Sequence, residues 1–209
     1  MKRISSNLND LSSLCLSIVM TILDLATKRK TARKFKLIPI KDEDIECILE
    51  TARQAPSGSN RQPWRFIIVK SPEMKKNIRE SAEAGERGFY DNLSPERKVW
   101  YNEKGLSPSK PNLTEAPVLI VVVGDTSAPN YKPSLWVSIA YMVLAIEERG
   151  LATVTYTPSD PNLVSEALGV PDGLMVESIL PIGFSDDPKE KETRFKVSEI
   201  TFRERWEGN

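Results

Sequence analysis

The sequence predicts an α+β protein in which helices cover the faces of one sheet. Short runs rich in β-branched residues alternate with longer segments of helical periodicity. One run, residues 118–123, is apolar at every position, as expected for a strand that is buried on both faces. The 209 residues, 40% hydrophobic and 28% charged, suffice for one domain with a substantial core.

Local patterns place the individual elements along the chain. Helices are predicted where apolar residues recur at three- and four-residue spacing, and strands where β-branched and aromatic residues run together. Ser71 and Pro72 suit a helix start, and Gly150 suits a helix end. The predicted helices are 20–30, 42–52, 71–90, 134–149 and 161–168, and the predicted strands are 64–69, 118–123, 151–157 and 175–184.

Three segments lack an ordinary surface pattern. Residues 91–115 are rich in proline and charge, and we expect a lid over about 86–115, since long loops in compact domains often have that function. The predicted helix 134–149 is apolar nearly all round, which indicates burial in the core or between subunits. The tail from Lys189 onward has little to pack against and is predicted to be an arm that adds to another surface.

Residues 1–19 are predicted to be an extension, and 20–209 the single domain. The basic start and a short apolar run faintly resemble a secretory leader, but no cleavage site is clear. The alternative is an N-terminal extension, or a start placed too early, with Met20 opening the domain.

Composition excludes several kinds of chemistry. The absence of histidine rules out a Ser-His-Asp triad, a Cys-His pair and any His-ligated metal site. Cys15 and Cys47 have no CxxC spacing and no companion ligands, so we expect no metal and a reduced, cytoplasmic environment. The net charge of zero and the absence of a long apolar stretch predict neither a nucleic-acid nor a membrane partner. Difficult chemistry would then require an organic cofactor.

The first motif is the basic cluster of Arg29, Lys30, Thr31 and Arg33 at the end of the first predicted helix. Guanidinium groups match phosphate oxygens and a hydroxyl adds a donor, so the cluster can bind a phosphate. The same charges also suit a solvated helix end, where cations favour the helix dipole. The cluster alone leaves both interpretations open.

The second motif is the turn segment 55–64, APSGSNRQPW. Its prolines restrict the loop, while Gly58 lets the backbone approach a ligand closely. The amides of Asn60 and Gln62 can donate to and accept from a heterocycle edge. By itself, the segment reads as an ordinary turn.

Together the two motifs resemble the nitroreductase family of flavoproteins, in which an RxxxR segment precedes an APSGxNxQPW turn and a strand. Residues 180–184, LPIGF, are similar to the family's PxGY strand end, and the likeness covers about 20–202. The resemblance implies the nitroreductase fold, with a central, mostly antiparallel sheet flanked by helices in an intertwined homodimer. Helix 134–149 would lie in the dimer core, and the tail would embrace the partner.

The resemblance also implies that FMN is bound. The basic cluster and Arg194 would hold its phosphate and pyrimidine edge, and the turn would lie along the ring system, partly from the second subunit. The implied FMN ligands are Arg29, Lys30, Thr31, Arg33, Pro56, Ser57, Gly58, Asn60, Thr155, Tyr156, Thr157 and Arg194.

Residues 153–158, TVTYTP, resemble the TVTxTP strand end of the iodotyrosine deiodinase branch of the family. In that branch a threonine hydroxyl, here Thr157, hydrogen-bonds flavin N5 and favours one-electron steps, which would make Thr157 catalytic. Tyr156 departs from the branch's pattern. Threonine is also frequent in ordinary strands, so the motif has a purely structural alternative.

A trio of polar residues points to the same branch. Glu86 and Tyr90 share one face of a predicted helix, and Lys110 follows in the predicted lid. In the deiodinase branch such a trio clamps the substrate's zwitterion: Glu takes the ammonium, Lys the carboxylate, and Tyr bonds between them. Ser59 would add a backbone contact, where the branch has alanine. The alternative is a solvated charged helix with an unrelated lysine.

The sequence therefore predicts an FMN-dependent oxidoreductase that reductively dehalogenates a halogenated tyrosine. One alternative is an NAD(P)H-dependent nitro- or quinone reductase of the same fold, which needs no zwitterion clamp. A second alternative is a flavin-storage protein, which would bind FMN without turnover.

Overall fold

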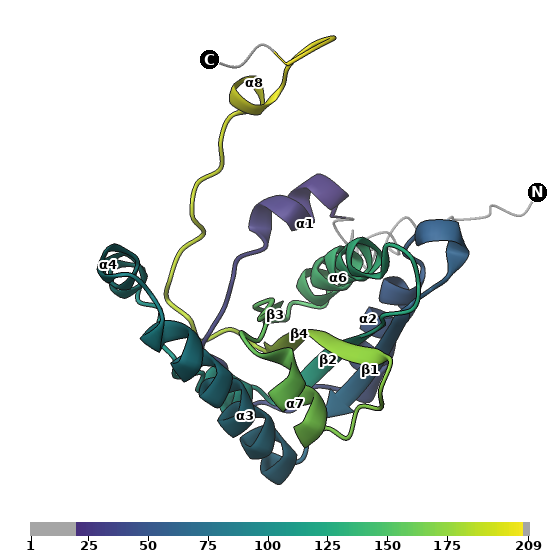
Figure 1. Ribbon diagram of the computed structural model, residues 1–209. Coiled ribbons are helices and arrows are strands. Elements are labelled where there is room, and N and C mark those ends of the chain that lie inside the picture. Colours follow the sequence, from purple (N-terminus) through teal and green to yellow (C-terminus); the bar gives the residue numbers. More distant parts are fainter. Residues whose placement is uncertain (1–19, 207–209) are drawn as a thin grey trace, which may run out of the picture.

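Four antiparallel strands form the central sheet in a computed structural model that describes residues 20–206 (Figure 1). The order β1-β2-β4-β3 confirms the predicted sheet, and three of the strands lie close to their predicted bounds. The expectations for residues 1–19 fall outside the described part of the chain. The strands are β1 Trp64–Val69, β2 Val118–Asp125, β3 Ala152–Thr153 and β4 Leu174–Gly183.

The predicted strand 151–157 was too long. Only Ala152 and Thr153 pair with β4, and Tyr156 then forms a single bridge with Ile179. The register is the same at Thr153 and at Tyr156, so the hydrogen-bonding position on β4 between their partners is Pro181. Proline has no N–H to donate, and the ladder is interrupted there.

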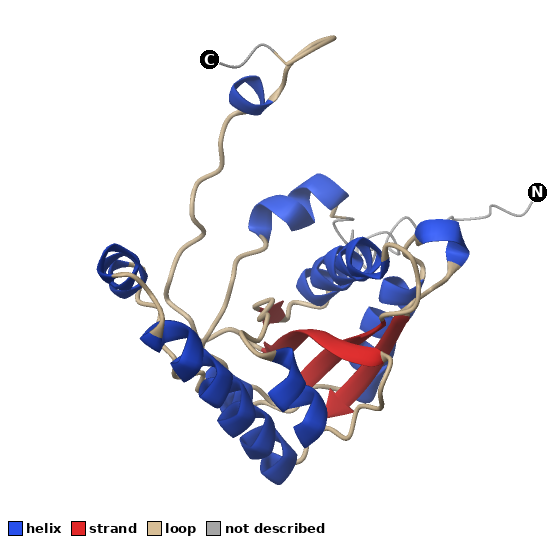
Figure 2. Ribbon diagram, viewed as in Figure 1, coloured by secondary structure: helices blue, strands red, loops and turns tan. Residues whose placement is uncertain are grey.

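Helices cover both faces of the sheet (Figure 2). Helices α2 and α6 pack on the face of β2 that carries Ile120 and Val122. Helices α3 and α7 pack on the opposite face with Val121 and Val123. The helices are α1 Ile22–Lys28, α2 Asp42–Arg53, α3 Pro72–Asp91, α4 Pro95–Glu103, α5 Asn112–Glu115, α6 Tyr131–Glu148, α7 Pro161–Ala167 and α8 Val197–Ile200.

Burial of both sheet faces explains the unbroken apolar run of β2. Its residues from Val118 to Val123 are at most 2% exposed, which confirms the predicted doubly buried strand. Helix α6 buries one face, where Leu135, Ile139 and Met142 are at most 1% exposed, so the predicted burial is confirmed for that face only; the helix begins at Tyr131 rather than at residue 134. Trp136 and Tyr141 stay partly exposed on this helix. Gly150 follows it with a positive φ of 68°, the conformation expected at a helix end.

The lid region contains the helix α4, which was not predicted from the sequence. Ser94 caps α4 by accepting a hydrogen bond from the Arg97 N–H, and Pro95 occupies the first turn. The same Ser-Pro-Glu start precedes α3 and could have identified it. Helix α4 buries no residue, so hydrophobic periodicity did not reveal it.

Both ends of the described chain expose apolar side chains. The tail leaves the body of the protein as an extended segment that ends beyond α8 (Figure 1). Phe195, Val197 and Ile200 are more than half exposed there, as are Ile22 and Leu23 on α1. No helix within residues 20–206 is both long and apolar enough to cross a bilayer.

We expect Ile120→Ala to lower the free energy of unfolding by about 2–5 kcal/mol, because the side chain is fully buried in the middle of the sheet. Ile68 lies opposite Ile120 on β1 but is 45% exposed, so Ile68→Ala should cost less than half as much. Urea unfolding followed by tryptophan fluorescence measures both changes. Equal losses would contradict the central position of Ile120 in the core.

Candidate active site

The main cavity has a volume of about 870 Å³ and lies between α3, the lid region and the segment after β3. The walls include both the trio of Glu86, Tyr90 and Lys110 and residues of the 153–158 segment, although these are far apart in the sequence. The predicted site residues that line it are Arg33, Glu86, Tyr90, Lys110, Thr155, Tyr156 and Thr157.

An ion pair lies in the wall of this cavity. The Glu86 carboxylate is 3.1 Å from the Lys110 ammonium, with side-chain exposures of 7% and 16%. Tyr90 lies one helical turn beyond Glu86, and its ring centre is 5.8 Å from the Lys110 nitrogen. The structure therefore brings the predicted trio together.

This arrangement suits a ligand that carries both charges close together. The ammonium and carboxylate of an α-amino acid are adjacent, and Glu86 and Lys110 offer complementary charges at a similar separation. Burial and the charge of Glu86 raise the pKa of Tyr90, so its hydroxyl remains protonated and can donate a hydrogen bond.

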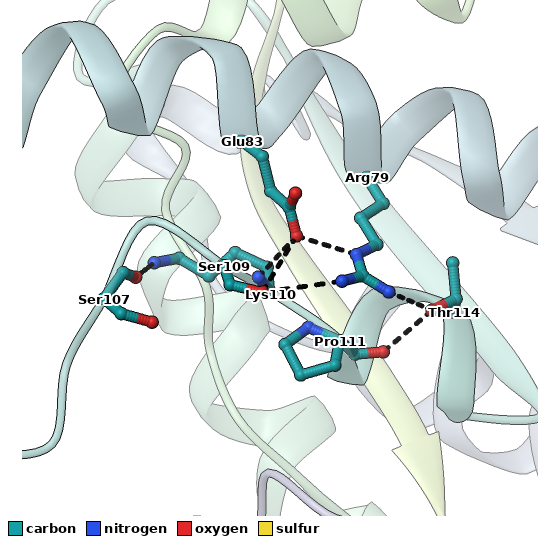
Figure 3. A network of polar contacts seen from close by, with 7 residues as sticks. All are labelled: Arg79, Glu83, Ser107, Ser109, Lys110, Pro111 and Thr114. Carbon is teal, nitrogen blue, oxygen red and sulfur yellow. Dashed lines mark hydrogen bonds and ion pairs between the residues drawn. The ribbon is translucent and has the colours of Figure 1, made fainter.

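A hydrogen-bond network fixes the segment that carries Lys110 (Figure 3). Glu83, on α3, accepts hydrogen bonds from the Lys110 backbone N–H at 2.7 Å and from Arg79 Nε at 2.7 Å. Arg79 donates in turn to the Thr114 hydroxyl at 3.0 Å. The Lys110 ammonium also donates to the Ser107 carbonyl oxygen. The network fastens both sides of Lys110 to the helix that carries Glu86.

Hydrogen bonding decides the ionisation of Glu83. Burial disfavours its charge, but the bonds from the Lys110 N–H and Arg79 outweigh this and lower the pKa of the carboxyl. Because this pKa is lowered, the ionised carboxylate stabilises the folded state at pH values above 4.5, the ordinary pKa of glutamate. The stabilisation is lost as the pH falls through the lowered pKa.

Aromatic side chains join α4 to α3 beside the trio. The ring centres of Tyr90 and Tyr101 are 5.3 Å apart in an edge-on arrangement, and those of Phe89 and Tyr101 are 5.8 Å apart. The Arg97 guanidinium lies 5.8 Å from the Phe89 ring centre. Phe89, Tyr90 and Tyr101 all line the cavity, so this cluster gives it an aromatic wall.

A second cavity, of about 140 Å³, is basic and shares Arg33 with the first. It also contains Lys30, Thr31 and Arg194, as predicted for a phosphate site. Five cationic side chains line it against two acidic ones, Glu190 and Glu192. The donors, the charge and the small volume fit a phosphate group.

The backbone holds this basic cavity in place. The Lys30 ammonium donates to the carbonyl oxygens of Asp187 and Lys189, each at 2.8 Å, and the Arg33 N–H donates to the Asp187 carboxylate at 2.7 Å. Burial and the neighbouring Arg194 both lower the pKa of Arg29. Cations crowded in this way favour an anionic ligand.

The turn that contains Pro56, Ser57, Gly58, Ser59 and Asn60 lies elsewhere in the same chain. None of these five residues lines either cavity. The Gly58 N–H donates to the Ser134 hydroxyl on α6 at 3.2 Å, which fixes the turn against that helix. Ser59 has a positive φ of 49°, which is uncommon for a residue other than glycine and is found more often at binding sites, and Asn60, whose residue type adopts this conformation more readily, has a φ of 52°.

The chain matches the nitroreductase family over residues 26–184. It belongs to this family. It is 44% identical to the iodotyrosine deiodinase of Thermotoga neapolitana, with 84% of this chain and 95% of that protein covered. It is 34% identical to the iodotyrosine deiodinase of Haliscomenobacter hydrossis, with 75% of each covered.

A crystal structure of oxidized iodotyrosine deiodinase bound to FMN and 3-iodo-L-tyrosine is similar to this chain, with 44% identity and a TM-score of 0.80. The similarity covers 85% of this chain and 96% of the other. These findings confirm the predicted nitroreductase fold and family.

Several residues around the cavities were not predicted from the sequence, and four of them have charged or hydrogen-bonding roles. Ser159 donates to Glu86, Asp187 binds the Arg33 backbone, and Lys189 and Lys191 line the basic cavity. The alternation of lysines before Arg194 was the available signal for the last two. No local pattern marks Ser159, because its partner is 73 residues away.

We expect Glu83→Ala to speed amide hydrogen exchange at Lys110, because the N–H loses its acceptor. Hydrogen–deuterium exchange of the peptide that covers residues 104–114 measures the change. Glu80→Ala is the matched control, because Glu80 on the same helix is exposed and forms an ion pair with the exposed Lys76 at 3.8 Å. Similar protection in the two variants would contradict the anchoring role of Glu83.

Proposed function

We propose that the protein is an FMN-dependent oxidoreductase that reductively dehalogenates a halogenated tyrosine. The observation that carries the proposal is the Glu86–Lys110 pair beside Tyr90, in a cavity that shares Arg33 with a basic, phosphate-sized cavity. The similarity to a deiodinase crystallised with FMN and 3-iodo-L-tyrosine supports both ligands.

The residues of the two cavities fit FMN. Lys30, Thr31, Arg33 and Arg194 would hold the phosphate, with Arg29 nearby. Thr157 lines the main cavity and would direct its hydroxyl to flavin N5. Bound and reduced, FMN supplies the two electrons of the reaction.

The chain itself would bind and orient the substrate. Glu86 takes the ammonium, Lys110 takes the carboxylate, and the protonated Tyr90 donates a hydrogen bond between them. The lid helix and its aromatic wall exclude water, which strengthens both charged contacts. The carbon–iodine bond is replaced by a carbon–hydrogen bond: one proton and two electrons enter, and tyrosine and iodide leave.

We also propose that the enzyme is a homodimer. The 56–60 turn lies away from the cavities of its own chain, so it is free to complete the site of a second copy. Trp136 and Tyr141 on α6, and the apolar tail, offer the surface that such a pairing would cover. The cytoplasmic location remains a prediction from the sequence.

Arg33→Ala should weaken FMN binding by about tenfold to a hundredfold, since a hydrogen bond to a charged group contributes about 1.5–3 kcal/mol. Titration of the apoprotein with FMN, followed by fluorescence, gives the dissociation constant. Arg53→Ala serves as the control because Arg53 is exposed and forms an ion pair with its helix neighbour Glu50, away from both cavities. Unchanged affinity in Arg33→Ala would remove Arg33 from the proposed phosphate site.

The FMN-loaded protein should bind 3-iodo-L-tyrosine with quenching of flavin fluorescence, and dithionite should then drive release of iodide. Lys110→Ala should weaken this binding by about tenfold to a hundredfold, because the substrate carboxylate loses its cation. Lys98→Ala, a change on the exposed side of the lid helix, should bind normally.

Two outcomes would contradict the proposal. One is the absence of both quenching and iodide release together with brisk NADPH-dependent reduction of a nitroarene, which would indicate a general nitroreductase. The other is FMN binding without oxidation of the reduced flavin by any substrate, which would indicate a storage protein.

A further inference from the structure

Two hydroxyl groups bind the Glu86 carboxylate at the oxygen that does not pair with Lys110. Tyr156 donates to Glu86 Oε1 at 2.9 Å, and Ser159 donates to the same oxygen at 2.7 Å. The other oxygen, Oε2, is the one that lies 3.1 Å from Lys110. One carboxylate oxygen is therefore fixed by neutral donors, and the other is offered to a cation.

Tyr156 is suited to act as a permanent donor. Burial and the negative charge of Glu86 raise the pKa of its phenol far above the ordinary value, so the hydroxyl stays protonated. Its backbone exchanges two hydrogen bonds with Ile179, at 3.0 and 2.7 Å. Tyr156 thus connects Glu86 rigidly to the central sheet.

A glycine allows these donors to reach Glu86. A Cβ at Gly85 would lie 2.8 Å from Asp160 Cβ and 3.0 Å from the Asp160 N atom. Any larger residue would push away the segment that carries Tyr156 and Ser159. Gly88, three residues further along α3, has nothing within 4 Å of the same position. Glycine inside a helix costs about 1 kcal/mol relative to alanine, and at Gly85 the close approach accounts for its presence.

We propose that Tyr156 and Ser159 are positioning residues that orient Glu86 toward a substrate ammonium, and that Gly85 admits the segment that carries them. The inference rests on the proposed function and adds a determinant of specificity. A carboxylate held at one oxygen has little freedom to turn away, so the other oxygen is preorganised for the ammonium. The site should therefore discriminate an amino acid from the same compound without its amino group.

The test compares 3-iodo-L-tyrosine with 3-(4-hydroxy-3-iodophenyl)propanoate, which lacks the ammonium, by calorimetry on the FMN-loaded protein. Tyr156→Phe keeps the ring beside Lys110 but removes the donor. We expect it to bind iodotyrosine about tenfold more weakly. Affinity for the propanoate should change less than twofold, a difference that general loosening of the cavity would not produce. Ser127→Ala, which removes a hydroxyl that donates to Asp125 and lines neither cavity, controls for the loss of a hydroxyl elsewhere.

Three further variants keep the inference testable if Tyr156→Phe folds poorly. Ser159→Ala should reproduce the selective loss, and Gly85→Ala should exceed it, whereas Gly88→Ala should bind both ligands normally. In a Glu86→Gln background, Tyr156→Phe should weaken the binding of iodotyrosine almost no further, because the group that Tyr156 orients has already changed.

The outcomes separate this inference from the proposed function. If the wild-type protein binds iodotyrosine and Tyr156→Phe binds it equally tightly, only the positioning role is overturned. An equal loss for both ligands also overturns it, since that indicates a packing effect. If the wild-type protein does not bind iodotyrosine at all, the proposed function fails and the inference fails with it.

Discussion

Glu86 carries a carboxylate into the interior of the protein, and the geometry of the site depends on how that charge is compensated. An ionised group that is only 5% exposed needs charged or hydrogen-bonding partners, because burial without them is costly. Its three partners come from two segments: Lys110 from the lid region, and Tyr156 and Ser159 from the segment after β3. A single buried carboxylate thus joins α3, the lid and the sheet around one cavity.

The lid meets this requirement through contacts of its own. Lys110 can face Glu86 because Glu83, one turn earlier on α3, holds the Lys110 backbone. Helix α4 buries nothing in the main core and is attached through the aromatic contacts of Tyr101. A segment held by a few polar and edge-on aromatic contacts is expected to be less stable locally than the core, which fits the predicted role of a lid that admits and releases a ligand.

The two ends of the site differ in charge. The basic cavity around Arg33 and Arg194 has an excess of cations, while the Glu86–Lys110 end is balanced. An anion such as a phosphate is favoured at the first, and a zwitterion at the second. This division matches a phosphorylated cofactor and an amino acid substrate bound in two neighbouring cavities that share Arg33.

The sequence alone determined the family, the doubly buried strand β2 and the trio of Glu86, Tyr90 and Lys110, because each depends on residue types at fixed short spacing or in recognisable motifs. Helix α4 was missed because it has no buried face, and β3 was overestimated because its ladder depends on Pro181 in another strand. Only the tertiary structure decided that Tyr156 and Ser159 hold Glu86, and that the 56–60 turn lies apart from its own chain's cavities. Those arrangements join residues about 70 positions apart, and packing between elements, rather than local preference, fixes them.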